Sequence, residues 1–345
     1  MRQFKLVVAA LVAFIISFSS MSHLLVYAQD EGDRVPYSVQ PLLPDNQVNS
    51  DVTYFDIAMD KGQEQSLEVM VFNSSDQEIK VSVATNFAAT NGNGLITYDG
   101  SIEQYDQSMQ FLFTEIAKPR DEELTVAPGE SLVTYIDIDL PDESFDGQIL
   151  GGIYFTLLED EEELEGAVGF VNEYSYAIGV NITEKDNNTV VTPQLELREV
   201  KPELINHRTG IQTTFANITP VLISQLEFEG RIYRQDSEEA LYTRTVQPFS
   251  VGPNNLFHFP VSLEDKPLKP GDYIFRGHAK NDDHQWEFEQ TFSISEEESH
   301  TINDQAVVLE ETSPWNGWLI GAVVVIGLLL GVIIYLMYRN NTSEQ

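Results

Sequence analysis

Residues 67–83 read LEVMVFNSSDQEIKVSV, with apolar side chains at every second position on either side of a polar centre. The alternation covers residues 67–71 and 79–83, and the polar run NSSD occupies residues 73–76. A period of two places one face of a strand against a core and the other face in water. We therefore predict two β-strands that pair as a hairpin through a turn at 73–76.

The same period continues outward from this segment. A turn signal, APGE at 127–130, precedes alternating apolar residues at 132–140. Two more strands are predicted at 148–158 and 170–182, on either side of an acidic run. We expect these two strands to pair with each other as a second hairpin.

Residues 191–310 repeat the pattern, with turn signals such as Gly252-Pro253 and Lys269-Pro270-Gly271 between short alternating segments. The predicted strands span 194–200, 210–218, 224–233, 240–248, 255–263, 272–280 and 286–295. Strands at this spacing indicate a sandwich of immunoglobulin type. The sequence thus predicts an all-β fold with two immunoglobulin-like β-sandwich domains in tandem.

The predicted domains are 37–160 and 168–310, the second with its core at 193–296. The strand at 168–183 completes the first domain if it pairs across the acidic run, and the boundary then falls near 185–192. The alternative assigns this strand to the second domain.

The N-terminal segment has the features of a signal peptide over residues 1–28. A basic start with Arg2 and Lys5 precedes an apolar stretch at 6–18, and uncharged residues close the segment at 26–28. A membrane helix that stays in place is the weaker alternative, because the apolar run is short and gives way to several serines.

The C-terminal segment predicts a transmembrane helix at 318–338, followed by a cytoplasmic tail at 339–345. Residues 318–337 carry no charge, and at ~1.5 Å per residue they span a bilayer core of ~30 Å. Arg339 follows on the side expected to be cytoplasmic. The acidic stretch 296–313 before the helix predicts a polar stalk, with a short helix around 306–309.

Composition restricts the environment and the partners. The chain has a formal net charge of −36 and no cysteine. Nucleic acid is not expected as a partner, because its phosphates would be repelled. An exported chain without disulfides must rely on core burial, which favours the surface of a Gram-positive bacterium.

Catalytic and metal-binding patterns are weak. The chain lacks cysteine and a Gly-x-Ser-x-Gly motif, and the histidines outside the leader do not cluster in the sequence. His278 with Asp282, Asp283 and His284 comes nearest to a metal site, but a polar hairpin turn explains the same residues. No catalytic, cofactor-binding or metal-binding residue is predicted, and the binding residues are unknown.

Two acidic features of the sequence also have simpler explanations than a functional site. The run EDEEELE at 159–165 lacks the spaced ligands and the glycine of a calcium loop, so a solvated tip or linker is favoured. Carboxylate pairs for glycan hydrolysis have too many possible members to be informative. Asp137 and Asp139 are more simply the solvent face of a strand.

Short motifs fall into two groups along the sequence. The first group comprises YSVQP at 37–41, LPDNQ at 43–47, YFD at 54–56 and FDGQILGGI at 145–153. The second comprises NEYSY at 172–176, VKP at 200–202, LKPGDY at 268–273 and WEF at 286–288. The two groups resemble the first and second domains of the WxL-interacting proteins, a family of surface proteins of Gram-positive bacteria.

The resemblance implies a first domain that binds peptidoglycan, a second that binds host proteins, and association with surface proteins carrying Trp-x-Leu (WxL) domains. It also implies a boundary near the acidic run, which gives the strand at 170–182 to the second domain. No binding residue carries over. Tyr54, Phe55 and the segment 147–152 are better explained by packing than by ligand contacts.

The leading hypothesis is therefore a non-enzymatic surface scaffold that binds WxL-domain proteins and peptidoglycan, with host matrix proteins as further partners. Its rivals are a wall-glycan hydrolase that uses carboxylates and a chaperone that pairs through a strand edge. Residues 37–190 are more acidic than 191–310, so anionic wall polymers would repel the first domain. Wall binding is expected to use neutral glycan or bridging divalent cations.

Overall fold

The computed structural model describes residues 35–158 and 173–307. The predicted leader at 1–28, the acidic run at 159–165 and the predicted helix at 318–338 with its tail lie outside the described residues. Within the described ranges, no helix is both long enough and apolar enough to cross a membrane. The described chain is mostly strand, as expected for an all-β protein.

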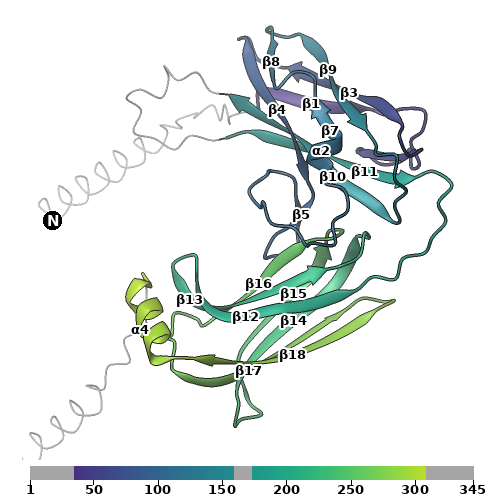
Figure 1. Ribbon diagram of the computed structural model, residues 1–345. Helices are drawn as coiled ribbons and strands as arrows, with labels where there is room; N and C mark the ends of the chain where they lie inside the picture. Colours follow the sequence, from purple (N-terminus) through teal and green to yellow (C-terminus); the bar gives the residue numbers. More distant parts are fainter. Residues whose placement is uncertain (1–34, 159–172, 308–345) are drawn as a thin grey trace, which may run out of the picture.

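The first half of the chain contains two sheets around one core (Figure 1). Its elements are β1 (Tyr37–Leu42), β2 (Phe55–Met59), β3 (Glu64–Asn73), β4 (Ile79–Phe87), β5 (Ala89–Thr90), β6 (Ile96–Thr97), α2 (Phe113–Ile116), β7 (Ala117–Pro119), β8 (Glu123–Val126), β9 (Ser131–Asp139), β10 (Gln148–Leu158) and β11 (Ser175–Glu184). One sheet has the order β1-β3-β9-β7 and the other β2-β11-β10-β4-β8, while β5 and β6 form a small ribbon.

The hairpin predicted at residues 67–83 is wrong, although both of its strands exist. β3 pairs with β1 and β9, whereas β4 pairs with β10 and β8 in the opposite sheet. The turn at 73–76 therefore connects the two sheets. Val69 and Val81 are both fully buried in the same core, which they enter from opposite sheets. A hairpin and a connection between two sheets therefore give the same alternation of apolar and polar residues.

The second predicted hairpin is confirmed. β10 pairs with β11 in antiparallel register from Gln148↔Thr183 to Thr156↔Ser175. β11 also pairs in parallel with β2, so it lies between β2 and β10 within the sheet. The strand that follows the acidic run is thus hydrogen-bonded to the first half of the chain.

The second half also has two sheets on one core. Its strands are β12 (Leu195–Ile205), β13 (Arg208–Asn217), β14 (Ile223–Arg234), β15 (Ala240–Val251), β16 (Leu256–Ser262), β17 (Gly271–Lys280) and β18 (Gln285–Ile294). The sheet orders are β12-β13-β16 and β15-β14-β17-β18. All seven strands predicted from the alternation are present, and their core is rich in phenylalanine. Phe215 and Phe228 meet edge to face with ring centroids 5.0 Å apart.

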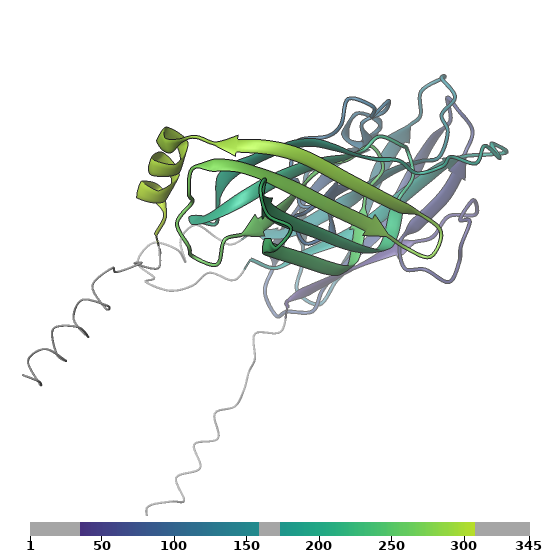
Figure 2. The same ribbon diagram turned by 90° about the horizontal axis from the view of Figure 1, so that it is seen from below.

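The stalk predicted at 296–313 is wrong over its first part, because Glu296–Gln305 form the helix α4. Ser295 and Glu298 make a capping box that satisfies the first backbone donors of this helix. Asn303 Nδ2 and Ser299 Oγ donate hydrogen bonds to Leu268 O at 3.0 and 2.9 Å, so α4 is fixed to the second half. Figure 2 shows the helix against one end of the strands.

Candidate functional site

The two halves meet through turns at the ends of their strands, with backbone hydrogen bonds between them. Gln148 N donates to Pro220 O at 2.8 Å, and Ser250 N donates to Gly94 O at 2.8 Å. Pro220 lies in the turn between β13 and β14, at the end of β13 that is far from α4. These bonds hold the halves to each other at fixed points.

A buried polar cluster reinforces this junction. Thr90 Oγ1 donates to Asn255 Oδ1 at 2.7 Å, and Asn255 Nδ2 donates to Ala88 O at 2.9 Å. Gly252 N in turn donates to Thr90 Oγ1 at 2.9 Å. Thr90 and Asn255 are each only 1% exposed. Buried polar groups without partners would be costly, so this mutual satisfaction favours one relative placement of the halves.

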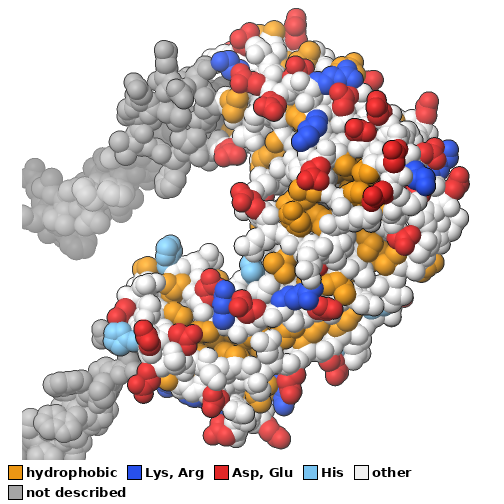
Figure 3. All heavy atoms as spheres, viewed as in Figure 1, with side chains coloured by type: hydrophobic (Ala, Val, Ile, Leu, Met, Phe, Trp, Pro, Cys, Tyr) orange, Lys and Arg blue, Asp and Glu red, His pale blue; other side chains and the backbone are white. Residues whose placement is uncertain are grey.

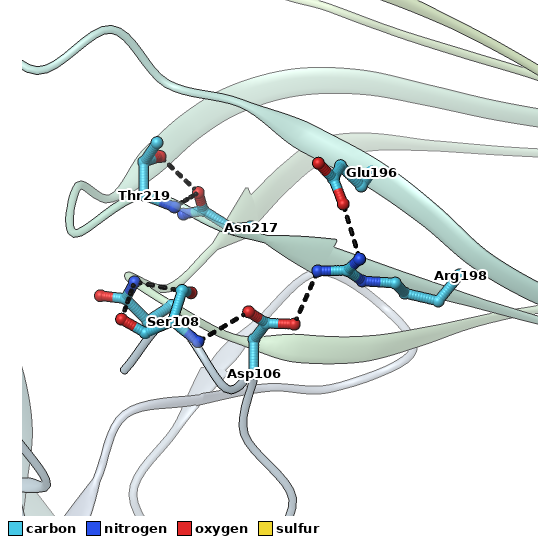
Figure 4. A network of polar contacts seen from close by, with 7 residues as sticks. Asp106, Ser108, Glu196, Arg198, Asn217 and Thr219 are labelled. Carbon is cyan, nitrogen blue, oxygen red and sulfur yellow. Dashed lines mark hydrogen bonds and ion pairs between the residues drawn. The ribbon is translucent and has the colours of Figure 1, made fainter. Parts of the chain in front are cut away.

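An ion pair lies at the edge of the same junction (Figure 4). Arg198 Nη2 is 3.0 Å from Asp106 Oδ2, and its Nη1 is 2.7 Å from Glu196 Oε2. Arg198 lies at a bulge of β12, where the register shifts between Leu197 and Glu199. The Asp106 side chain is almost fully buried, whereas that of Arg198 is one-third exposed.

The environment of Asp106 keeps its carboxylate ionised. Burial by itself raises the pKa of Asp106, but hydrogen bonds from the backbone and side chain of Ser108 and the charge of Arg198 outweigh it. The pKa of Asp106 is therefore lowered from its ordinary value. Asp106 N also donates to Asn254 O at 3.0 Å, so the same residue contacts the second half through backbone and side chain.

Arg244 of β15 makes a further contact between the halves. Its Nη2 donates to Gly92 O at 2.7 Å and to Asn93 Oδ1 at 2.8 Å. The guanidinium lies over the Phe259 ring, 4.6 Å from the centroid. Burial lowers the pKa of Arg244 from its ordinary value.

Next to these contacts, a cavity of about 440 Å³ opens between the halves. Its wall from the first half includes the loop 108–111, the turn 144–146 and the start of β10. The second half contributes Pro220, Pro253 and Asn254, among others. Figure 3 shows hydrophobic side chains around the region where the halves meet, while acidic side chains are spread over both halves. We call this cavity the junction pocket.

Most of the polar side chains that line the junction pocket already have partners. Asn254 Nδ2 donates to Ser108 Oγ at 2.9 Å, and Asn187 Nδ2 donates to Phe145 O at 2.8 Å. Ser144 Oγ donates to Glu184 Oε1 at 2.6 Å. These bonds give the pocket a wall that is formed before any ligand arrives.

A second, more open hollow of about 530 Å³ lies on the outer face of β14, β17 and β18. Arg231 pairs with Glu229 at 2.9 Å and Arg276 with Glu289 at 2.8 Å, and Arg276 lies over the Tyr233 ring. The hydrogen bond from Arg276 to Glu289 raises the arginine pKa. Since the cations are paired with carboxylates on the same face, this surface is nearly balanced in charge.

The histidine and aspartate residues of the possible metal site at 278–284 do not form a metal-binding cluster in the described part of the chain. His278 lies on β17 opposite Glu287 of β18, while Asp282 and Asp283 belong to the turn of that hairpin. His284 stacks on Trp286 with ring centroids 5.7 Å apart. Across residues 35–158 and 173–307, no group of three or more His, Asp or Glu side chains could hold a metal ion.

The other residues discussed in the sequence analysis, Asp137, Asp139, Tyr54 and Phe55, are mainly structural. Asp137 accepts hydrogen bonds from Arg120, whose Nη2 lies 2.8 Å from its Oδ1, and from Ser66. Asp139 is exposed at the end of β9. Phe55 is fully buried, whereas Tyr54 is 41% exposed.

The glycine-rich segment 147–152 packs closely against neighbouring groups. A Cβ at Gly151 would meet the Phe113 ring, and one at Gly152 would lie 2.6 Å from the Tyr98 ring. Burial raises the pKa of Tyr98 to about 12. Gly147 has φ +70° and lies directly against Pro220 O. The sequence pattern singled out this segment but did not reveal its role at the junction.

Comparison with protein families identifies the chain. One family model, described as WxL Interacting Protein, peptidoglycan binding domain, matches residues 37–157. Another, described as WxL Interacting Protein, host binding domain, matches residues 165–304. The chain belongs to the WxL-interacting protein family. The host-binding model includes β11, although in this WxL-interacting protein β11 pairs with β10 and β2 of the first half.

Solved structures similar to this WxL-interacting protein include chaperones. The YadV chaperone is 8% identical, covers 75% of this chain and 100% of its own, and has a TM-score of 0.28. The CsuC–CsuE chaperone–adhesion subunit complex of Acinetobacter baumannii is 10% identical, with coverages of 65% and 89% and a TM-score of 0.29. At these identities and TM-scores the similarity supports no conclusion about function. No curated protein matches the chain.

Proposed function

We propose that this WxL-interacting protein is a surface scaffold that holds peptidoglycan through its first half and a host protein through its second. The observation that carries the proposal is the order of the two family matches, with a peptidoglycan binding domain at 37–157 and a host binding domain at 165–304. WxL-domain surface proteins are its proposed partners. Binding, rather than glycan cleavage, is its proposed activity.

The proposed setting is a Gram-positive cell surface. The leader at 1–28 directs export, and the uncharged segment 318–338 anchors the chain with its ectodomain outside. Both halves are proposed to be immunoglobulin-like sandwiches, which is supported by two sheets on one core in each. The pairing of β11 with β10 supports a domain boundary at 185–192.

The test is retention on purified peptidoglycan of the full chain in detergent, with and without a chelator. Retention without release of soluble glycan fragments supports the scaffold. Release of fragments would support a hydrolase instead, and no retention would contradict wall binding. Equal retention in chelator would remove bridging by divalent cations. Co-purification from detergent-solubilised cells tests association with WxL-domain proteins.

A further inference from the structure

The junction pocket has the size and position of a ligand site. Its volume of about 440 Å³ falls within the range of roughly 300–1,000 Å³ that is typical of small-molecule sites, which often lie between domains. Its walls come from loops of the first half and from turns of the second. Neither half alone encloses it.

One part of the wall is apolar and includes aromatic rings. Phe111 and Phe145 meet edge to face, with ring centroids 6.1 Å apart. Met109, Pro220 and Pro253 add further apolar surface. Phe111 and Met109 remain partly exposed, so a ligand can cover them.

Two glutamine side chains supply free hydrogen-bonding groups. Gln110 is exposed on the loop before α2, and Gln148 is half-buried at the start of β10. Within the described part of the chain, neither side-chain amide has a hydrogen-bond partner. Each amide offers one acceptor oxygen and two N–H donors, which matches the C=O and N–H of a ligand amide.

The charges around the pocket exclude anionic ligands. Asp146 is the one charged side chain among the described residues that line it, and no lysine or arginine does. The chain itself has a net charge of −36. A carboxylate or phosphate would therefore be repelled, and the nearby cation Arg198 is already paired with Asp106 and Glu196.

From these features we propose that the junction pocket binds an uncharged acetamido sugar, as a unit of a glycan strand. The acetamido group pairs with Gln110 and Gln148, and the apolar face of the sugar ring covers Phe111 and Met109. This inference rests on the proposed binding of peptidoglycan and assigns its glycan contact to a place built by both halves.

The test is calorimetric titration of the full chain in detergent with a soluble tetramer of N-acetylglucosamine. Cellotetraose, which carries hydroxyl groups in place of the acetamido groups, is the matched ligand control. We expect the acetylated sugar to bind at least about fivefold more tightly, since one neutral hydrogen bond contributes about 1 kcal/mol. Equal affinities, or no binding of the acetylated sugar, would overturn the proposal.

The matched variants are Gln148→Ala, Gln110→Ala and Gln104→Ala. Gln104 is exposed on the same loop as Gln110 but does not line the pocket. We expect about fivefold weaker binding for each of the first two variants and unchanged binding for the third. Gln110 is exposed, so its variant should fold even if Gln148→Ala does not. Equal affinity of all folded variants would place the sugar elsewhere.

Retention on intact peptidoglycan separates this inference from the proposed function. If the wild-type chain is retained and the folded Gln110→Ala and Gln148→Ala variants are retained equally, the junction pocket is excluded while wall binding stands. If no form is retained but the tetramer binds in the pocket, wall binding fails while the pocket still recognises the sugar.

Discussion

Arg198 Nη2 on β12 lies 3.0 Å from Asp106 Oδ2 in the other half. The Asp106 carboxylate is buried, whereas the Arg198 guanidinium is partly exposed. The pair joins segments 92 residues apart in sequence. It lies beside Ser108 and Asn254, which line the junction pocket. Its loss should therefore affect both stability and the shape of that pocket.

Asp106→Asn should lower the free energy of unfolding by about 2 kcal/mol at pH 7, because a charge-assisted bond and its ion pair are lost. The pKa of Asp106 is lowered in the folded chain, so its contribution is complete above the ordinary aspartate pKa and is lost as pH falls through the folded value. The difference between wild type and variant should therefore shrink below about pH 4. Urea unfolding from pH 7 to pH 3 measures it.

Asp282→Asn is the control for this measurement, because Asp282 is exposed in the turn between β17 and β18. It should change the unfolding free energy by less than about 0.5 kcal/mol at every pH. A difference for Asp106→Asn that stayed constant down to pH 3 would contradict the role of its charge.

Gly147→Ala should destabilise the chain more than Gly129→Ala. Both glycines have positive φ, +70° and +68°, so each alanine introduces a backbone strain of about 1 kcal/mol. At Gly129 nothing lies within 4 Å of the new Cβ, whereas at Gly147 the Cβ would meet Pro220 O across the junction. We expect an additional loss of about 1–3 kcal/mol at Gly147. Thermal and urea unfolding give both values. Equal losses of stability would show that Pro220 can move away from the new Cβ without further destabilising the chain.

Ser295→Ala should fray α4 and lower stability by about 1 kcal/mol, because the Glu298 amide loses its side-chain acceptor. Hydrogen exchange of residues 296–305 should rise in this variant. Glu298→Gln is the control, since glutamine also completes a capping box and should leave exchange nearly unchanged. Unaltered exchange in Ser295→Ala would mean that the contacts of Asn303 and Ser299 with Leu268 suffice to hold the helix.

Two fragments test where the first half ends. Fragment 35–190 contains β11, whereas fragment 35–157, which stops where the family match ends, lacks it. Without β11, β2 loses its parallel partner and β10 loses a neighbour along its length. We expect cooperative thermal unfolding by circular dichroism for 35–190 only. Equally cooperative melting of both fragments would show that β11 is dispensable for the first half.

Strand positions could be predicted from the sequence because alternation is a local property. In the second half the predicted strands coincide with β12 to β18 within a few residues. Strand pairing is not local, and the error at 67–83 shows why. A turn such as 73–76 can join neighbours in one sheet or cross between two sheets, and both outcomes bury Val69 and Val81 in the same core.

The junction pocket could not be predicted for a related reason. Met109, Gln110 and Phe111 lie on a loop without periodicity, and long-range packing brings them to Pro220 and Pro253. For α4, by contrast, a local signal existed. Ser295 and Glu298 have capping-box spacing, whereas the acidic composition of the segment on its own indicates a stalk.

The position of β11 between β2 and β10 bears on how the polypeptide is made. Synthesis proceeds from the N-terminus, so β2 and β10 emerge before the strand that joins them. Until residue 184 has been delivered, both must wait with unpaired backbone groups, which are prone to association with other chains. The first half thus depends on a strand that comes late in its sequence, and any delay before residue 184 emerges would leave these backbone groups unpaired for longer.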